Sequence, residues 1–225
     1  MTTDTLIDDL GNIDAVFLIG HLPYANYGYT SRWDQFTAQV EPINSISYLQ
    51  GMFIHTTQKY TISVLLTLYN LFSGGNHERT WENSGSIYNG LASGGECVTE
   101  HDWREGSERY KLIEQCFASA NKHKQSWLIF AAHHVLGYSS NEWYVDEGLF
   151  EEAMGREHLQ KLWQNYKVDM TFFGHVHNYE RVCPIYQTSH YSDVVNGTIH
   201  VVVGGGGAHL NRFTTINTTR SVLRD

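Results

Sequence analysis

A chain of 225 residues is long enough for one large domain with a substantial core, and its 41% hydrophobic and 17% charged content is ordinary for a globular protein. The formal net charge of −9 argues against nucleic acid or an anionic membrane as a partner, because both need a basic face. The 13 histidines, against 15 lysines and arginines, draw attention because imidazole is the commonest metal ligand.

The opening segment "MTTDTLIDDL" (1–10) has neither a basic region nor a long apolar run, so it does not have the pattern of a signal peptide. The most apolar stretch, "YTISVLLTLYNLF" (60–72), is too short to span a bilayer and holds polar residues, so we expect a buried helix or strand there. Two sequons, at 196–198 and 217–219, would accept glycans if the chain were secreted. The three cysteines have no metal-like spacing.

Four near-continuous apolar runs, each bounded by glycine or polar residues, are typical of strands buried on both faces of a sheet. Two helical patterns lie between them. The segment 107–122 opens with Ser107 as a candidate N-cap, and the segment 155–167 places apolar side chains at helical spacing. Strands that alternate with helices predict an α/β fold with a parallel or mixed sheet. The predicted strands are 13–20, 127–133, 168–174 and 198–205.

In α/β folds, ligands bind beyond the carboxyl ends of the strands. Three of the four predicted strands end in histidines, and the fourth ends in the glycine run 204–207, which leaves room for backbone to approach a ligand. The histidines are His21 after the first strand, His133 and His134 after the second, and His175 and His177 after the third.

Each of these motifs also has a plainer interpretation. His175 and His177, two apart on an extended loop, can project the same way and hold one or two metal ions, but a hydrogen-bonded surface pair is commoner. Asn76 and His77 follow a Gly-Gly bend and can form an ordinary turn. His133 is equally typical of a hydrogen-bonded histidine at a strand end. Their shared position at strand ends is what favours a site.

The motifs, taken in order, resemble the metallophosphoesterase series. Three longer strings, at 24–43, 174–186 and 198–210, resemble specifically the large plant-type purple acid phosphatases. The resemblance covers nearly the whole chain outside about 45–72, and it implies a metallophosphoesterase-like αββα sandwich of mixed sheets flanked by helices. The motifs are Gly20-x-x-x-Tyr24, Gly75-Asn76-His77-Glu78, His133 and Gly174-His175-x-His177.

The resemblance implies hydrolysis of phosphate monoesters by two metal ions, a ferric ion beside Zn(II), Mn(II) or Fe(II). Such ions bind the phosphoryl group, neutralise its developing charge and supply hydroxide, so no protein nucleophile is needed. An acidic protein could in this way receive an anionic substrate. The implied partner is a small phosphate ester, and the implied localisation is extracellular.

Five side chains carry over by motif as metal ligands. Tyr24 and His177 are implied for the ferric ion, and Asn76, His133 and His175 for the divalent ion. One further residue, His77, is implied as the catalytic group that contacts phosphate or protonates the leaving alkoxide. Hard oxygen donors mixed with imidazoles suit Fe(III) beside Zn(II) or Mn(II).

His21 stands where the family pattern Gly-Asp-x-x-Tyr has the aspartate that bridges both metals. A carboxylate can bridge two metal ions and carries a negative charge. A neutral imidazole has a single nitrogen lone pair to offer, so it can bind only one ion, and it carries no charge. The family's first aspartate ligand also has no counterpart after Met1. On ligand count we therefore expect weak binding of one divalent ion at best, with zinc the fitting occupant.

By resemblance, residues 1–225 are expected to form a single, partial metallophosphoesterase catalytic domain without the family's N-terminal β domain. Residues 45–72 are an atypical insertion, and 94–106 fuse two stretches that relatives separate. The C-terminus stops before the usual closing strands. We hypothesise a mis-spliced or mis-predicted gene product; a transcript that encodes 51–72 in frame at normal abundance would refute this.

Three functions stay open. The first is an acid phosphatase with the family's dinuclear centre, and the second is an impaired or inactive relative that binds one metal or phosphate. Position 21 and the missing upstream aspartate separate these two. The third, a plain interaction module, does not explain why histidines follow the strands. Nothing in the sequence predicts the oligomeric state.

Overall fold

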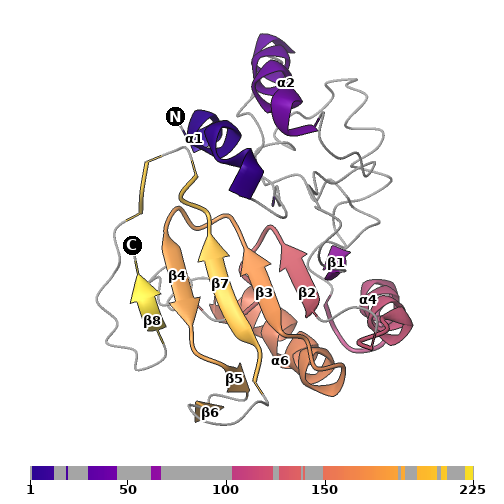
Figure 1. Ribbon diagram of the computed structural model, residues 1–225. Coiled ribbons are helices and arrows are strands. Elements are labelled where there is room, and N and C mark those ends of the chain that lie inside the picture. Colours follow the sequence, from indigo (N-terminus) through magenta and orange to yellow (C-terminus); the bar gives the residue numbers. More distant parts are fainter. Residues whose placement is uncertain are drawn as a thin grey trace. The chain divides into compact units, whose positions relative to one another are not determined.

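The computed structural model describes residues 2–12, 19, 30–44, 62–66, 103–123, 127–137, 139, 149–186, 189–190, 197–206, 209–211 and 221–224 (Figure 1). The chain divides into two compact units. The first comprises residues 1–60 and 68–96, and the second comprises residues 61–67 and 97–225. All the histidines whose positions are described below belong to the second unit. The predicted strand 13–20 lies, except for Ile19, outside the described residues.

In the first unit, two helices and a short 3-10 turn are described. Helix α1 spans Thr2–Asp8, the turn η1 spans Leu10–Asn12, and helix α2 spans Thr30–Asn44. Buried Leu10 and Ile43 join them in a small apolar cluster. Asn12 donates a 2.7 Å hydrogen bond to the Asp9 carboxylate, which closes the turn after α1.

The second unit is built on a six-stranded mixed sheet with the order β1-β2-β3-β7-β4-β8. The first four strands in this order run parallel, and β4 runs antiparallel to both its neighbours, as Figure 1 shows for β2, β3, β7 and β4. A separate pair, β5 and β6, forms a small antiparallel ribbon. The strands are β1 (Ile62–Leu66), β2 (Trp127–Ala132), β3 (Met170–Phe173), β4 (Tyr179–Val182), β5 (Ile185–Tyr186), β6 (Ser189–His190), β7 (Ile199–Val203) and β8 (Ser221–Arg224).

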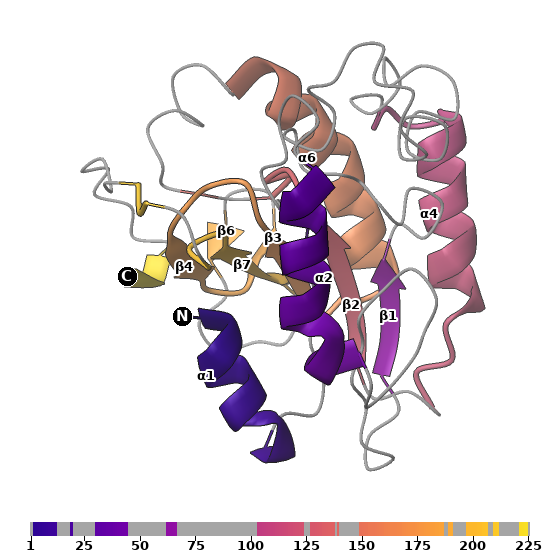
Figure 2. The same ribbon diagram turned by 90° about the horizontal axis from the view of Figure 1, so that it is seen from above.

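Two helices lie on one face of this sheet, α4 (Glu108–Ser119) and α6 (Leu149–Asn165) (Figure 2). Ser107 caps α4 as predicted, because its hydroxyl accepts a 3.1 Å hydrogen bond from the backbone N–H of Tyr110. Helix α6 begins six residues before the start that the apolar spacing predicts. The mixed sheet with its helices confirms the predicted α/β fold class. None of the described helices is long and apolar enough to cross a membrane.

Aromatic side chains from the sheet and from α6 form the centre of the core. The ring of Trp163 packs against Phe130 at 5.6 Å and against Phe173 at 6.3 Å between ring centroids. Phe117 of α4 completes the group at 6.2 Å from Phe130. These side chains are at most 2% exposed, so the helices are held to the sheet by apolar burial. These contacts account for the helical spacing of apolar residues along 107–122 and 155–167.

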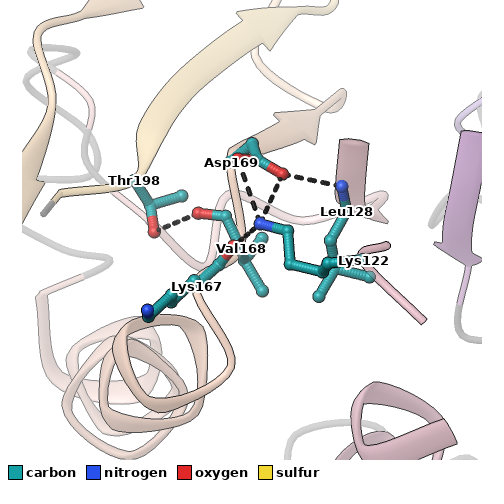
Figure 3. A network of polar contacts seen from close by, with 6 residues as sticks. All are labelled: Lys122, Leu128, Lys167, Val168, Asp169 and Thr198. Atoms are coloured by element: carbon teal, nitrogen blue, oxygen red, sulfur yellow. Dashed lines mark hydrogen bonds and ion pairs between the residues drawn. The ribbon is translucent and has the colours of Figure 1, made fainter. Parts of the chain in front are cut away.

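A polar network ties the amino ends of three neighbouring strands together (Figure 3). The Asp169 carboxylate accepts a 2.7 Å hydrogen bond from the backbone N–H of Leu128, and its own N–H donates to the Leu128 carbonyl at 2.9 Å. Lys122 pairs with the same carboxylate at 3.0 Å. Thr198 donates to the carbonyl of Val168 at 3.0 Å. These bonds set the register of β2, β3 and β7, and so decide which residues meet at their carboxyl ends.

Replacing Asp169 by alanine is expected to lower the free energy of unfolding by about 1–3 kcal/mol, because the buried N–H of Leu128 loses its side-chain acceptor. The matched control is Glu105→Ala. The Glu105 carboxylate pairs with Lys161 at 3.5 Å on the surface, where an ion pair contributes less than about 1 kcal/mol. Urea denaturation measures both values. Equal losses in the two variants would show that Asp169 acts only as a surface charge.

Candidate metal centre

Three of the predicted site residues belong to the described part of the chain: His133, His175 and His177. The structure places the first directly after β2 and the other two in the loop after β3. The remaining predicted residues lie outside the described residues, so their roles stay predictions. These are Tyr24, Asn76 and His77, together with His21 at the position of the family aspartate.

The pairing of β2 with β3 brings two histidine-bearing segments to one edge of the sheet. The last residues of these strands, Ala132 and Phe173, are register partners. The N–H of Gly174 donates a 3.0 Å hydrogen bond to the His133 carbonyl, which joins the two segments just beyond the strands. The expectation that polar residues gather at the carboxyl ends of the strands is met here.

Three imidazoles gather at this edge. The ring of His175 lies 5.2 Å from that of His133 and 4.6 Å from that of His134, measured between centroids, and the rings of His133 and His134 are 5.2 Å apart. His133 is 2% exposed, whereas the other two are partly buried. The motif pattern did not select His134; its place directly after a predicted strand was the available signal.

The His-x-His segment is not extended, contrary to the expectation from its spacing. His175 has a φ of 61°, the left-handed region that non-glycine residues rarely adopt. The N–H of Val176 donates to the Gly174 carbonyl at 2.7 Å, and that of Asn178 to the Val176 carbonyl at 2.8 Å. Strain of about 1–3 kcal/mol at such a residue persists only where the surroundings hold it, and it concentrates at functional sites. This tight turn directs His175 toward His133 and His134.

His177 lies in a different setting from His175. Its Nδ1 atom is 3.1 Å from the backbone carbonyl oxygen of His209, and its own carbonyl accepts a 2.7 Å hydrogen bond from the N–H of Asn211. Because a carbonyl can only accept, Nδ1 carries the proton. In the neutral ring, the lone pair is then on Nε2. This arrangement, in which a carbonyl fixes the tautomer, is typical of metal-binding histidines.

The glycine after β7 is required by the histidine loop. A β-carbon at Gly204 would overlap the carbonyl oxygen of Val176 and lie 2.7 Å from its carbonyl carbon. Gly206, two residues on, has nothing within 4 Å of the same position. Within the run 204–207, Gly204 therefore lets the backbone of β7 approach the loop that carries His175 and His177.

A buried, neutral histidine lies beneath the segment that carries His133 and His134. Burial, with a smaller contribution from the charge of Arg156, lowers the pKa of His200 to about 3. Its Nδ1 lies 2.8 Å from the Thr171 hydroxyl. A β-carbon at Gly137 would overlap that same nitrogen, so the segment after β2 packs directly on the imidazole. No sequence motif pointed to His200.

The donor chemistry at this edge suits a divalent ion of borderline softness, since imidazole is a ligand that zinc favours. Among the residues that the structure describes, no three imidazole, thiol or carboxylate side chains are placed to hold an ion by themselves. The fit is therefore partial: the histidines could contribute donors, and the other donors would have to come from residues outside the described ranges.

Comparison with known proteins identifies the family to which the sequence and the fold are similar. The family model described as "Calcineurin-like phosphoesterase" matches residues 2–179. The chain is 51% identical to "Probable inactive purple acid phosphatase 27" of Arabidopsis thaliana and 46% identical to "Nucleotide pyrophosphatase/phosphodiesterase" of Hordeum vulgare. Both alignments cover 100% of this chain, but 39% of the first relative and 66% of the second.

Among solved structures, the chain is similar to a purple acid phosphatase isolated from yellow lupin (Lupinus luteus) seeds. The TM-score is 0.74 and the identity 48%, with 100% of this chain and 42% of the lupin chain covered. The similarity includes both the fold and the sequence, and it extends over less than half of the lupin protein.

Proposed function

Because the chain belongs to the calcineurin-like phosphoesterase family, we propose that it binds phosphate monoesters at a metal centre and hydrolyses them by acid-phosphatase chemistry. The observation that supports this most is the gathering of His133, His134 and His175 beyond two neighbouring parallel strands. Small phosphate esters are the proposed substrates.

The proposed ligands of the divalent ion are His133, His175 and the amide oxygen of Asn76, and those of a ferric ion are His177 and Tyr24. Such ions, when bound, neutralise phosphoryl charge and supply a hydroxide nucleophile. The chain's own contribution is to hold the donors in place. For His177, the His209 carbonyl keeps the proton on Nδ1, so that the lone pair of the neutral ring is on Nε2, the atom proposed to bind the ion. His77 is proposed to contact the phosphate or protonate the leaving group.

We propose that turnover in this chain is impaired. His21 replaces a carboxylate, and one imidazole lone pair cannot join two ions. Four of the relatives carry "inactive" in their names, which supports the same conclusion. We therefore propose that this chain binds one divalent ion, zinc for preference, at the His133–His175 half of the centre, in place of the two ions that the full ligand set would hold. We also propose that the natural protein is secreted and carries glycans at the sequons 196–198 and 217–219. Glycosidase treatment of the natural protein tests for these glycans.

The test combines metal analysis of the purified chain with hydrolysis of p-nitrophenyl phosphate at mildly acidic pH. The unmodified chain is expected to hold one divalent ion and turn over slowly. His21→Asp is expected to raise metal content and to increase hydrolysis at least about tenfold, since the carboxylate can bridge. His175→Ala is expected to lose the ion, whereas His123→Ala, an exposed histidine after α4, retains it.

Two ions per chain together with ready turnover in the unmodified protein would refute the proposed impairment. A chain that binds no divalent ion and no phosphate would refute the phosphoesterase proposal itself.

A further inference from the structure

His134 is the one histidine of the gathered group to which the proposed function gives no task. Its ring is closer to His175 than the ring of His133 is, at 4.6 Å against 5.2 Å between centroids. His134 is only partly buried, whereas His133 is almost completely buried, with 2% of its surface exposed. The side chain therefore lies beside both proposed ligands of the divalent ion.

The motif pattern assigns the divalent ion to Asn76, His133 and His175, and so leaves His134 outside the proposed ligand set. Among the described residues, no three potential ligand side chains are placed to hold an ion by themselves, so the three gathered imidazoles are not proposed to form a ligand set of their own. A group next to two ligands that is not itself a ligand can still reach whatever the ion binds. An imidazole carries at least one N–H donor whether it is neutral or charged.

The negative net charge of the chain makes a hydrogen-bond donor useful at a site that binds an anion. With a formal net charge of −9, the protein as a whole repels a phosphate ester, and a hydrogen-bond donor beside the ion would add to the attraction that the ion provides. Hydrogen bonds to a charged phosphate oxygen are stronger than those between neutral groups. Of the three gathered imidazoles, His134 is the one that remains for this contact once His133 and His175 bind the ion.

We propose that His134 is a phosphate-contacting residue, whose ring N–H donates a hydrogen bond to a phosphoryl oxygen held at the His133–His175 centre. This inference rests on the proposed function, because it requires an ion on those two histidines. It adds a specific recognition contact that the motif pattern does not contain.

Ring packing is the competing explanation for the position of His134, since its plane is tilted by 46° against His175 and by 77° against His133. Two variants separate the explanations. His134→Phe keeps an aromatic ring for packing and removes the N–H, whereas His134→Gln removes the ring and keeps an N–H donor. His123→Ala, at an exposed position after α4, is the control for loss of a histidine.

The experiment uses the full 225-residue chain loaded with zinc and measures the affinity for inorganic phosphate by calorimetry, beside zinc content and thermal unfolding. We expect His134→Phe to keep its zinc and to bind phosphate about 10–100-fold more weakly, the loss typical of a hydrogen bond to a charged group. His134→Gln is expected to recover part of the affinity. His123→Ala is expected to match the unmodified chain.

Unchanged phosphate affinity in a folded, zinc-loaded His134→Phe variant would overturn the contact while leaving the proposed function intact. Loss of zinc from His134→Phe to the extent seen for His175→Ala would identify His134 as a ligand instead, and would equally overturn it. If the unmodified chain binds neither zinc nor phosphate, the proposed function fails and the inference fails with it.

Discussion

Replacing Gly204 by alanine is expected to weaken zinc binding by about 10–100-fold, as loss of a group that orients metal ligands does. The new β-carbon would overlap the Val176 carbonyl oxygen, which is backbone and cannot rotate away as a side chain can. The loop would have to move, and it carries both His175 and His177. We also expect a loss of about 1–3 kcal/mol in the free energy of unfolding, the usual effect of an extra group in a packed interior.

The matched control is Gly206→Ala, because a β-carbon at Gly206 meets nothing within 4 Å. Zinc titration and urea denaturation of both variants provide the measurements. We expect alanine to weaken zinc binding at Gly204, the first glycine of the run, and to leave zinc binding unchanged at Gly206, the third. Equal zinc affinities in the two variants would show that the histidine loop does not depend on the close approach of β7.

Stability is expected to fall as the pH is lowered from about 6.5 to about 3, because of His200. Its pKa in the folded protein is about 3, mainly through burial, against 6.5 for an exposed histidine. In that window the unfolded chain binds a proton that the folded chain does not, so acid favours unfolding. The contribution is fully present above pH 6.5 and declines at up to about 1.4 kcal/mol per pH unit, or about 5 kcal/mol across the window as an upper bound.

The non-titrating variant His200→Gln isolates this contribution. Its free energy of unfolding, measured in urea at pH 7 and again at pH 4, is expected to change less than that of the unmodified chain. His123→Gln removes an exposed histidine and is expected to leave the difference between the two pH values unchanged. If His200→Gln retained the full difference, the acid sensitivity would have to arise elsewhere in the chain. Mildly acidic conditions suit the proposed phosphatase chemistry, so this buried imidazole limits stability in the same range.

Local sequence patterns predicted much of the second unit. Apolar runs without alternation marked β2, β3 and β7, and their ends agree with the structure to within two residues. Periodic apolar spacing marked α4 and α6, and Ser107 caps the first of them as predicted. These features could be predicted because each depends on residues that are only a few positions apart in the sequence. The presence of His133 and His175 at one edge also followed, since parallel strands end at the same side of a sheet.

The arrangement within the site depended on contacts between segments far apart in the chain. Nothing local shows that His175 adopts a left-handed backbone, or that His134 turns toward it. The need for glycine at 204 comes from Val176, and the low pKa of His200 comes from its burial against Trp163 of α6 and Gly137.

The sequence by itself determined the α/β class, the family and the types of donor available, because hydrophobic periodicity and short motifs are properties of consecutive residues. Only the tertiary structure decided which imidazoles meet, which one is tied to a carbonyl and which glycine the loop requires. The physical reason is that close packing and hydrogen bonding act between surfaces that folding brings together, and their geometry is set by register and backbone approach rather than by spacing along the chain.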